Sequence, residues 1–145
     1  MEWLGGVGTA DDTRTWIAAK EEAWRQQGVG LWVVHETGGR FVGRAGLQTV
    51  PGDVAAALGD PRAVELLYAL VPEAWGKGYA TEIGAALLRI AFSRLRLGNV
   101  VAYTLPHNVR SRHVLEKLGM SYDRDLMHEQ RPHVLYRLFA PSRGE

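Results

Sequence analysis

The chain has 145 residues, 46% of them hydrophobic, and a formal net charge of +1. This length suits one well-buried domain, residues 1–145, and is too short for us to expect two. A net charge so close to zero argues against nucleic acid or a membrane surface as the partner. No run approaches the roughly 18 apolar residues of a membrane span, and the opening residues lack a signal-peptide pattern. Cysteine is absent, so we expect a cytoplasmic protein without disulfides, thiolate zinc ligands or a cysteinyl intermediate.

The charges are distributed unevenly along the chain. Residues 1–75 contain six Lys or Arg and ten Asp or Glu, whereas residues 76–145 contain eleven and six. This basic second half favours an anionic ligand of modest size. Basic side chains that merely solvate helices would give the same distribution, so both interpretations stay open.

The first half of the chain predicts one helix, a hairpin and a buried strand. Residues 9–28 have an N-cap threonine, early acidic residues and a terminal glycine, which are typical of a helix. The β-rich runs 30–36 and 41–50 are joined by "TGGR" and predict a hairpin. Residues 51–62 predict a loop with at most one short helical turn, and residues 63–71 are apolar on both faces apart from Glu65. That last pattern predicts a strand in the centre of a sheet.

The second half predicts two helices and three strands. Helical periodicity covers residues 78–96, and a further central strand follows at 99–105. A shorter helix is predicted within 106–119, and the runs 120–127 and 133–139 predict an antiparallel pair joined by the polar "HEQRP". The element order places one strand–helix–strand unit between antiparallel pairs, which predicts a mixed α+β sheet rather than a doubly wound one.

A glycine turn separates the strand at 63–71 from the long helix. Gly76 and Gly78 would weaken either element from inside, so we place them in the turn between the two. Amides in such a turn, at the positive end of a helix, suit an anion. The NTPase phosphate loop does not fit the surrounding residues, and the dinucleotide fingerprint fails because Thr81 stands at its third glycine position. A purely structural turn remains the alternative.

Two longer stretches resemble a known family. The segments "VELLYALVPEAWGKGYATEIGAALLRIAF" and "VVAYTLPHNVRSRHVLEKLGM" closely resemble the GNAT superfamily of acyl-CoA-dependent N-acetyltransferases. More narrowly, they look like the branch of bacterial ribosomal-protein N-terminal acetyltransferases. The resemblance runs from about residue 30 to the end and is most specific over 64–120. It implies a mixed, mostly antiparallel GNAT-like sheet with helices on both faces.

The resemblance implies a binding site for acetyl-CoA, which would serve as a co-substrate. The family's acyl-CoA loop has the form R/Q-x-x-G-x-G/A, and residues 75–80 match it with Trp at the first position. The backbone of this turn would hold the pyrophosphate, through Trp75, Gly76, Lys77, Gly78, Tyr79, Ala80 and Thr81. Pantetheine would pair with backbone near Leu70 and Val71. The second motif, Asn108-x-x-Ser111, implies that Asn108 contacts pantetheine, although a plain N-cap would require the same residue.

Two residues are candidates for the chemistry. Glu65 is the candidate base, since related enzymes often use a glutamate on this strand through a water; a strand-end carboxylate that faces solvent or pairs with arginine is the alternative. Many GNATs place a tyrosine seven residues after the asparagine to protonate the leaving thiolate, and here that position is Leu115. This departure makes Ser111 the candidate thiol partner or proton donor, with ordinary helix N-terminal hydrogen bonding as the alternative. Arg110, Arg112 and Lys117 could lie near the adenosine phosphates.

The start of the chain departs from the family pattern. Family members usually begin with an additional strand and helix, which residues 1–8 do not match. Their absence would leave residues 30–36 as an exposed edge strand, so we expect a homodimer or a rearranged N-terminus to cover it.

Three functions follow, each with its own prediction. The leading one is an N-acetyltransferase that acts by direct attack in a ternary complex, with a peptide N-terminus or a small-molecule amine as acceptor. A non-catalytic acyl-CoA-binding or regulatory module would bind the coenzyme without turnover, and a nucleotide-binding protein would bind ATP or NAD. We expect residues 51–62 and 125–133 to select the acceptor. No metal is expected, because the histidines of "HEQRPH" are five apart and Pro132 breaks any helix between them.

Overall fold

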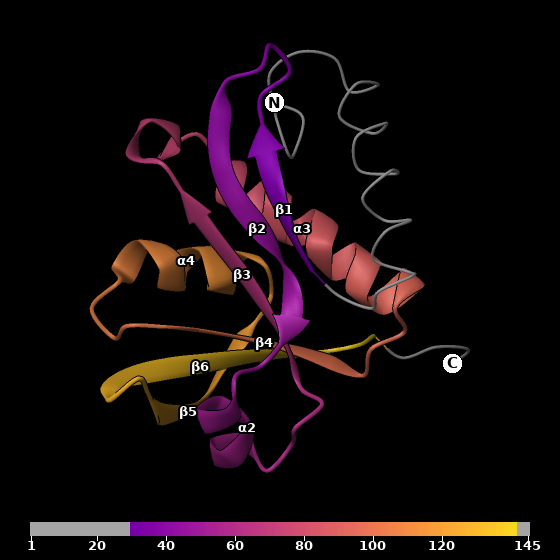
Figure 1. The fold of residues 1–145 in the computed structure, drawn as a ribbon, viewed down its shortest axis with the longest axis vertical. Coiled ribbons are helices and arrows are strands. Elements are labelled where there is room, and N and C mark those ends of the chain that lie inside the picture. Colours follow the sequence, from indigo (N-terminus) through magenta and orange to yellow (C-terminus); the bar gives the residue numbers. More distant parts are fainter. Residues whose placement is uncertain (1–29, 142–145) are drawn as a thin grey trace.

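The computed structural model describes residues 30–141. Residues 1–29 and 142–145 lie outside this range, as do the helix predicted within 9–28 and the expectation about the start of the chain. The described residues form a six-stranded sheet in the order β1-β2-β3-β4-β6-β5 (Figure 1). The predicted mixed α+β class is confirmed.

The elements follow the predicted order. They are β1 (Gly30–His35), β2 (Phe41–Thr49), α2 (Gly52–Leu58), β3 (Val64–Leu70), the 3₁₀ turn η1 (Pro72–Ala74), α3 (Tyr79–Arg89), the π-helical turn η2 (Ile90–Arg94), β4 (Asn99–Thr104), α4 (Val109–Lys117), β5 (Ser121–His128) and β6 (Arg131–Phe139). β3 and β4 pair in parallel, and every other neighbouring pair is antiparallel. Within residues 30–141, no helix is long and apolar enough to cross a membrane.

Alternation along the central strands divides the core into two layers. Val100 of β4 packs in the cluster that contains Ile83 and Leu87 of α3, and Ala102 packs in the cluster that contains Leu115 of α4. The intervening Val101 points the other way and packs with the α2 side, because successive strand residues face opposite sides of a sheet. Helices therefore cover both faces, as the resemblance implied.

Two segments differ from the expectation. Residues 51–62 were expected to be largely loop, and instead they contain the seven-residue helix α2, which ends at Gly59 with φ +67°. In the predicted connection at residues 128–132, β5 continues to His128 and β6 already begins at Arg131. The turn between them consists of Glu129 and Gln130, with φ values of +51° and +65°. The predicted connection "HEQRP" is thus shorter than expected.

The parallel pair β3–β4 separates soon after it forms. Its register has one pair, Glu65 with Val101, whereas β2 and β3 pair from Gly43 with Leu70 to Thr49 with Val64. In Figure 1 the two strands diverge from a common region toward α4. The carboxyl ends of β3 and β4 therefore leave a gap in the middle of the sheet.

Candidate active site

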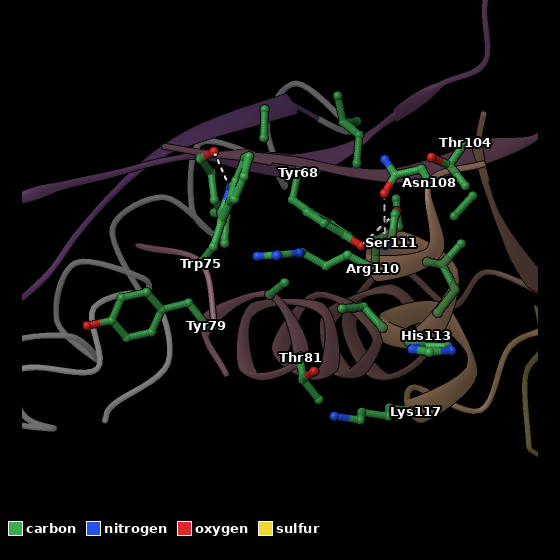
Figure 2. A pocket seen from close by; sticks show the side chains of 18 of the residues that line it. Tyr68, Trp75, Tyr79, Thr81, Thr104, Asn108, Arg110, Ser111, His113 and Lys117 are labelled. Carbon is green, nitrogen blue, oxygen red and sulfur yellow. Dashed lines mark hydrogen bonds between the residues drawn. The ribbon is translucent and has the colours of Figure 1, made fainter. Parts of the chain in front are cut away.

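A cavity of about 950 Å³ occupies this gap. Its wall combines β3, the glycine turn, the start of α3, the end of β4 and one side of α4 along its whole length (Figure 2). Residues whose side chains alternate between the two faces of β3 contribute to the lining, including Glu65 and Leu67 of one face and Leu66 and Tyr68 of the other. The cavity therefore reaches through the sheet where β3 and β4 separate.

The backbone of β3 offers polar groups to this cavity. The Val71 amide donates to the Val42 carbonyl at 2.9 Å, so the backbone N–H of Val71 points toward β2. Because backbone directions alternate along a strand, the Leu70 amide and carbonyl point the opposite way, toward the gap. Leu70 thus presents backbone to the cavity and Val71 does not.

The glycine turn has the geometry that an anion cradle requires. Gly76 and Gly78 have φ values of +76° and +83°, and a Cβ built on either residue would meet nothing within 4 Å. Gly78 is the N-cap of α3, and the Glu82 amide donates to its carbonyl at 3.1 Å. The amides of residues 79–81 precede this bond and are the ones that a helix leaves unpaired at its N-terminus. Positive φ explains why glycine is needed at both positions, and the free space lets a ligand approach the backbone.

Trp75 and Arg110 lie over the same wall. The Trp75 indole N–H donates to the Leu70 carbonyl at 3.0 Å, and the Arg110 guanidinium lies 4.7 Å from the Trp75 ring centroid. Figure 2 shows the Arg110 side chain extending toward the indole. The pair joins the glycine turn to α4 through a cation–π contact, and it places a positive charge on the cavity wall.

Glu65 is a buried carboxylate at the point where the strands part. Its side chain accepts a hydrogen bond from Gln48 Nε2 at 3.0 Å, and it also hydrogen-bonds to the Tyr103 hydroxyl. Only 5% of the residue is exposed, and this burial raises the pKa of Glu65 above its usual range. The expected alternative of a solvent-facing or arginine-paired carboxylate is wrong, because Glu65 pairs with an amide and a phenol instead.

Opposite Glu65, on the other face of the sheet, two hydroxyl groups meet. The Tyr68 and Ser111 oxygens lie 3.1 Å apart in hydrogen-bond contact, and the Ser111 amide donates to Asn108 Oδ1 at 3.1 Å (Figure 2). Asn108 is thus the N-cap of α4, as predicted. Leu115, which stands where many GNATs have tyrosine, is 1% exposed and packs in the core.

The predicted site residues gather at this cavity with few exceptions. Those that line it are Glu65, Leu70, Trp75, Gly76, Gly78, Tyr79, Ala80, Thr81, Asn108 and Ser111. Val71 and Lys77 do not line it. The Tyr79 side chain turns away from the other labelled residues in Figure 2, and its hydroxyl donates to Glu36. Burial, together with Glu36, raises the pKa of Tyr79 to about 12.

The three basic residues expected near the phosphates divide into two kinds. Arg110 and Lys117 line the cavity. Arg112 does not, because its Nε donates to the Tyr136 hydroxyl at 3.1 Å and one terminal nitrogen donates to the Pro106 carbonyl at 2.9 Å. Arg112 therefore anchors α4 to β6 and to the preceding loop.

Tyr68 and Tyr103 line the cavity and were not expected there. Both are tyrosines within apolar strands, and strand alternation indicates the face of each. Alternation does not indicate which helix residue lies opposite, since that depends on the docking of α4.

The two segments expected to select the acceptor are joined on the α2 side of the sheet. The Asp53 carboxylate accepts from the Glu129 amide at 2.9 Å and contacts His128 Nδ1 at 2.9 Å. The His128 ring also meets Tyr103, with centroids 5.2 Å apart. Because Tyr103 also hydrogen-bonds to Glu65, it links Glu65 to His128 and Asp53. Among residues 30–141, no cluster of three or more His, Cys, Asp or Glu could hold a metal ion.

The chain was compared with known families and proteins. A family model described as "Acetyltransferase (GNAT) domain" matches residues 1–121. YkkB of Bacillus subtilis (strain 168) is 28% identical over 137 residues, which is 94% of this chain and 76% of YkkB. The crystal structure of the acetyltransferase from Agrobacterium tumefaciens str. C58 is 29% identical with a TM-score of 0.63, covering 79% of this chain and 63% of that one.

A second similar structure was solved with a coenzyme derivative. Mycobacterium smegmatis RimJ in complex with CoA-disulfide has a TM-score of 0.67 at 23% identity, covering 92% of this chain and 64% of RimJ. At that identity the likeness supports the fold alone. This chain spans just under two thirds of the RimJ and Agrobacterium chains. The family match, together with the sheet and its gap, places this protein in the GNAT acetyltransferase family.

Proposed function

We propose that this protein transfers an acetyl group from acetyl-CoA to a primary amine by direct attack in a ternary complex. The observation that carries the proposal is the cavity through the β3–β4 gap. It has an amide-rich glycine turn at one end and a buried carboxylate at the gap. A nucleophile and an acyl donor held on the two sides of one gap need no covalent enzyme intermediate.

The glycine turn supports binding of the donor's pyrophosphate. Amides at the start of α3 would donate to phosphate oxygens, and the free space at Gly76 and Gly78 admits the approach. Arg110 and Lys117 would add positive charge along the same wall. The Leu70 backbone would pair with the pantetheine amides, while the Val71 amide remains committed to β2.

The position and the raised pKa of Glu65 support its role as the base that deprotonates the acceptor amine. An alkylammonium with a pKa of about 10 is mostly protonated at neutral pH, so it must lose a proton before it attacks. Glu65 lines the cavity, and its carboxylate is oriented by Gln48 and Tyr103. Its raised pKa makes it a better proton acceptor than an exposed glutamate. Ser111, on the opposite face, would hydrogen-bond to the departing sulfur.

The first experiment is calorimetric titration with acetyl-CoA of the parent protein and of Gly78→Glu. The parent should bind, and the new carboxylate should abolish binding by filling and charging the cradle. Gly39→Glu is the matched control, because Gly39 also has positive φ and no atom within 4 Å of its Cβ position, and it lies in the β1–β2 turn. If the parent does not bind, or if both variants bind like the parent, the proposed site is wrong.

Catalysis is then tested by thiol release with small amines and with peptides that carry free N-termini. Turnover by the parent and its loss in Glu65→Gln are the expected results. Tight coenzyme binding without turnover on any amine would instead favour the non-catalytic acyl-CoA-binding module. Competition by ATP or NAD would favour the nucleotide-binding alternative.

We also propose a homodimer paired along β1. β1 is the terminal strand of the described sheet, and one of its faces presents Leu31 and Val33, which are 46% and 43% exposed. Light scattering should give the dimer mass, and Val33→Lys should shift it toward monomer. A monomeric parent would contradict the dimer.

A further inference from the structure

Tyr68 is a half-buried phenol on the cavity wall that the proposed chemistry has not used. Its hydroxyl meets the Ser111 hydroxyl at 3.1 Å, and both residues line the cavity. Figure 2 shows the Tyr68 side chain crossing from β3 toward the first turn of α4. This hydroxyl pair bridges the two elements that flank the gap.

The pair has two protons and needs only one for its own hydrogen bond. If Tyr68 donates to Ser111 Oγ, the Ser111 proton is left over, and in the reverse arrangement the Tyr68 proton is left over. In either case one O–H remains for an acceptor inside the cavity. An isolated serine at this place would rotate freely, whereas the paired one is restrained.

The surrounding contacts hold the pair in position. The Ser111 amide is fixed by Asn108 Oδ1, and the next residue, Arg112, ties α4 to Tyr136 and to the Pro106 carbonyl. Burial also raises the pKa of Tyr68, so the phenol stays protonated and keeps its donor over the whole neutral range.

The side of the sheet on which the pair lies suggests its partner. Glu65 is three residues before Tyr68 on β3 and therefore faces the opposite side. An amine activated by Glu65 attacks from that side, so the group that leaves the carbonyl departs toward Tyr68 and Ser111. A departing thiolate is an anion, and a hydrogen bond to an anion is stronger than one to a neutral thioester sulfur.

We propose that Tyr68 is a positioning residue that orients the Ser111 hydroxyl, so that the free proton of the pair hydrogen-bonds to the sulfur of coenzyme A as it leaves. This inference rests on the proposed function. In the step, the amine nitrogen forms the new N–C bond, the C–S bond breaks and its electron pair goes to sulfur. The acceptor ammonium loses two protons, one before the attack and one as the amide forms, and each passes through the Glu65 carboxylate to solvent. Tyr68 and Ser111 keep their protons and stabilise the thiolate.

The test titrates the thiol of coenzyme A bound to the protein, followed by the ultraviolet absorbance of the thiolate. The parent should bind coenzyme A with a thiol pKa below that of the free coenzyme. Tyr68→Phe removes only the hydroxyl, and it should raise the bound thiol pKa by about one unit, a tenfold change in the ionisation constant. Ser111→Ala should do the same, and the double variant should be no worse than either single one.

Tyr122→Phe is the matched control. It also removes one tyrosine hydroxyl, bonded to Asp125 at 2.9 Å, but Tyr122 does not line the cavity. Besides Tyr68, the charged and titratable residues that line the same cavity are unchanged in every variant; they are Glu65, Tyr79, Tyr103, Arg110, His113 and Lys117. A difference between the two Phe variants therefore reports the Tyr68 hydroxyl.

Turnover provides the second readout. Tyr68→Phe should lower kcat about tenfold while the Kd for acetyl-CoA stays within twofold, because the interaction forms with the leaving sulfur and not with the intact donor. If Tyr68→Phe binds coenzyme A normally and its bound thiol pKa equals that of the parent, the role of Tyr68 is overturned. If the parent fails to bind coenzyme A at all, the proposed function falls, and this role falls with it.

Discussion

At the scale of single residues, Glu65 shows how a fold gives one side chain unusual chemistry. It is 5% exposed, yet it lines a cavity that reaches through the sheet. Removing a carboxylate from water disfavours its charged form, and hydrogen bonds from Gln48 and Tyr103 offset part of that cost. Burial is the larger effect, so the group holds a proton at a pH where an exposed glutamate would not.

This balance predicts the acid limb of the pH–rate profile. With Glu65 as the proposed base, kcat should fall as the pH drops through a midpoint above the ordinary glutamate value of 4.5. Glu65→Gln should lower kcat by about 10²- to 10⁴-fold and abolish this limb, while acetyl-CoA affinity stays unchanged. An acid limb that persists in the residual turnover of the Glu65→Gln variant would assign it to another group.

The same shift predicts the effect on stability. A pKa raised by folding means that Glu65 favours the folded state most when protonated, and this contribution is lost as the pH rises through the folded pKa. Glu65→Gln removes the buried charge, so its Tm at pH 7 should equal or exceed that of the parent. The difference should shrink as the pH is lowered. Thermal melts across pH 4–8 test this, and a large fall in Tm at pH 7 would contradict it.

At the scale of elements, the site depends on where α4 begins and where β3 lies. Asn108 caps α4 through its side-chain oxygen, and that bond positions the Ser111 amide one turn later. On the other wall, β3 lies against β2 with unusually close backbone at Gly43, where a Cβ would come 2.1 Å from the Ala69 carbonyl oxygen.

The N-cap role of Asn108 and its expected contact with pantetheine can be separated by substitution. Asn108→Ala loses the cap and should cost about 1 kcal/mol of unfolding free energy. Asn108→Asp keeps an oxygen acceptor at the cap but loses the amide donor, so stability should be retained while acetyl-CoA affinity falls. Urea unfolding and calorimetry measure the two effects. Equal acetyl-CoA affinity in Asn108→Asp and the parent would leave Asn108 as a cap alone.

Gly43 tests whether the position of β3 matters for donor binding. Gly43→Ala must displace backbone and adopt a φ of +154°, so it should destabilise the protein by about 1–3 kcal/mol or more. It should also weaken acetyl-CoA binding by moving Leu70, which lies 2.8 Å from the same Cβ position. Gly38→Ala, with no atom within 4 Å, is the matched control. Unfolding curves that overlay for both variants would refute the close approach.

At the scale of the whole molecule, distant segments meet on the α2 side of the sheet. Asp53 at the start of α2 joins the β5–β6 turn through the Glu129 amide and His128, about half the chain away. The hydrogen bond from the Glu129 amide is the main reason that the pKa of Asp53 lies below its usual value. The Asp53 carboxylate therefore stays charged and keeps this link as the pH falls toward the pKa of an ordinary aspartate. The two segments expected to select the acceptor thus form one surface.

Asp53→Ala should loosen that surface without touching the donor side. We expect KM for the acceptor amine to change severalfold, while the Kd for acetyl-CoA stays constant. Asp60→Ala is the control, because the Asp60 carboxylate accepts only a local bond from the Arg62 amide at 3.0 Å. If both variants keep the parent KM, the joined segments do not select the acceptor.

The sequence predicted the central framework well and the connections less well. The run at 63–71, apolar on both faces, predicted β3, and the glycines predicted the turn that follows it. Helix α2 is only seven residues long, so too few turns exist for a periodic signal. The β5–β6 turn was obscured because Glu129 and Gln130, not Asn or Gly, adopt its positive φ values.

In the candidate site, likewise, the sequence predicted individual residues but not the contacts between distant elements. Motif residues were predicted by number, whereas the Tyr68–Ser111 contact depends on how a strand and a helix 43 positions apart dock on each other. Local pattern contains no information on that docking. The pairing of Glu65 with Gln48 likewise follows from the β2–β3 register, which a single sequence specifies only through its turns.

The gap between β3 and β4 has a kinetic implication. If donor and acceptor enter from opposite faces of the sheet, neither needs to leave before the other arrives, and each product has its own exit. Coenzyme A should then inhibit competitively against acetyl-CoA but not against the amine. A bulky acceptor, even the terminus of a folded protein, could remain bound while coenzyme A leaves and another acetyl-CoA binds.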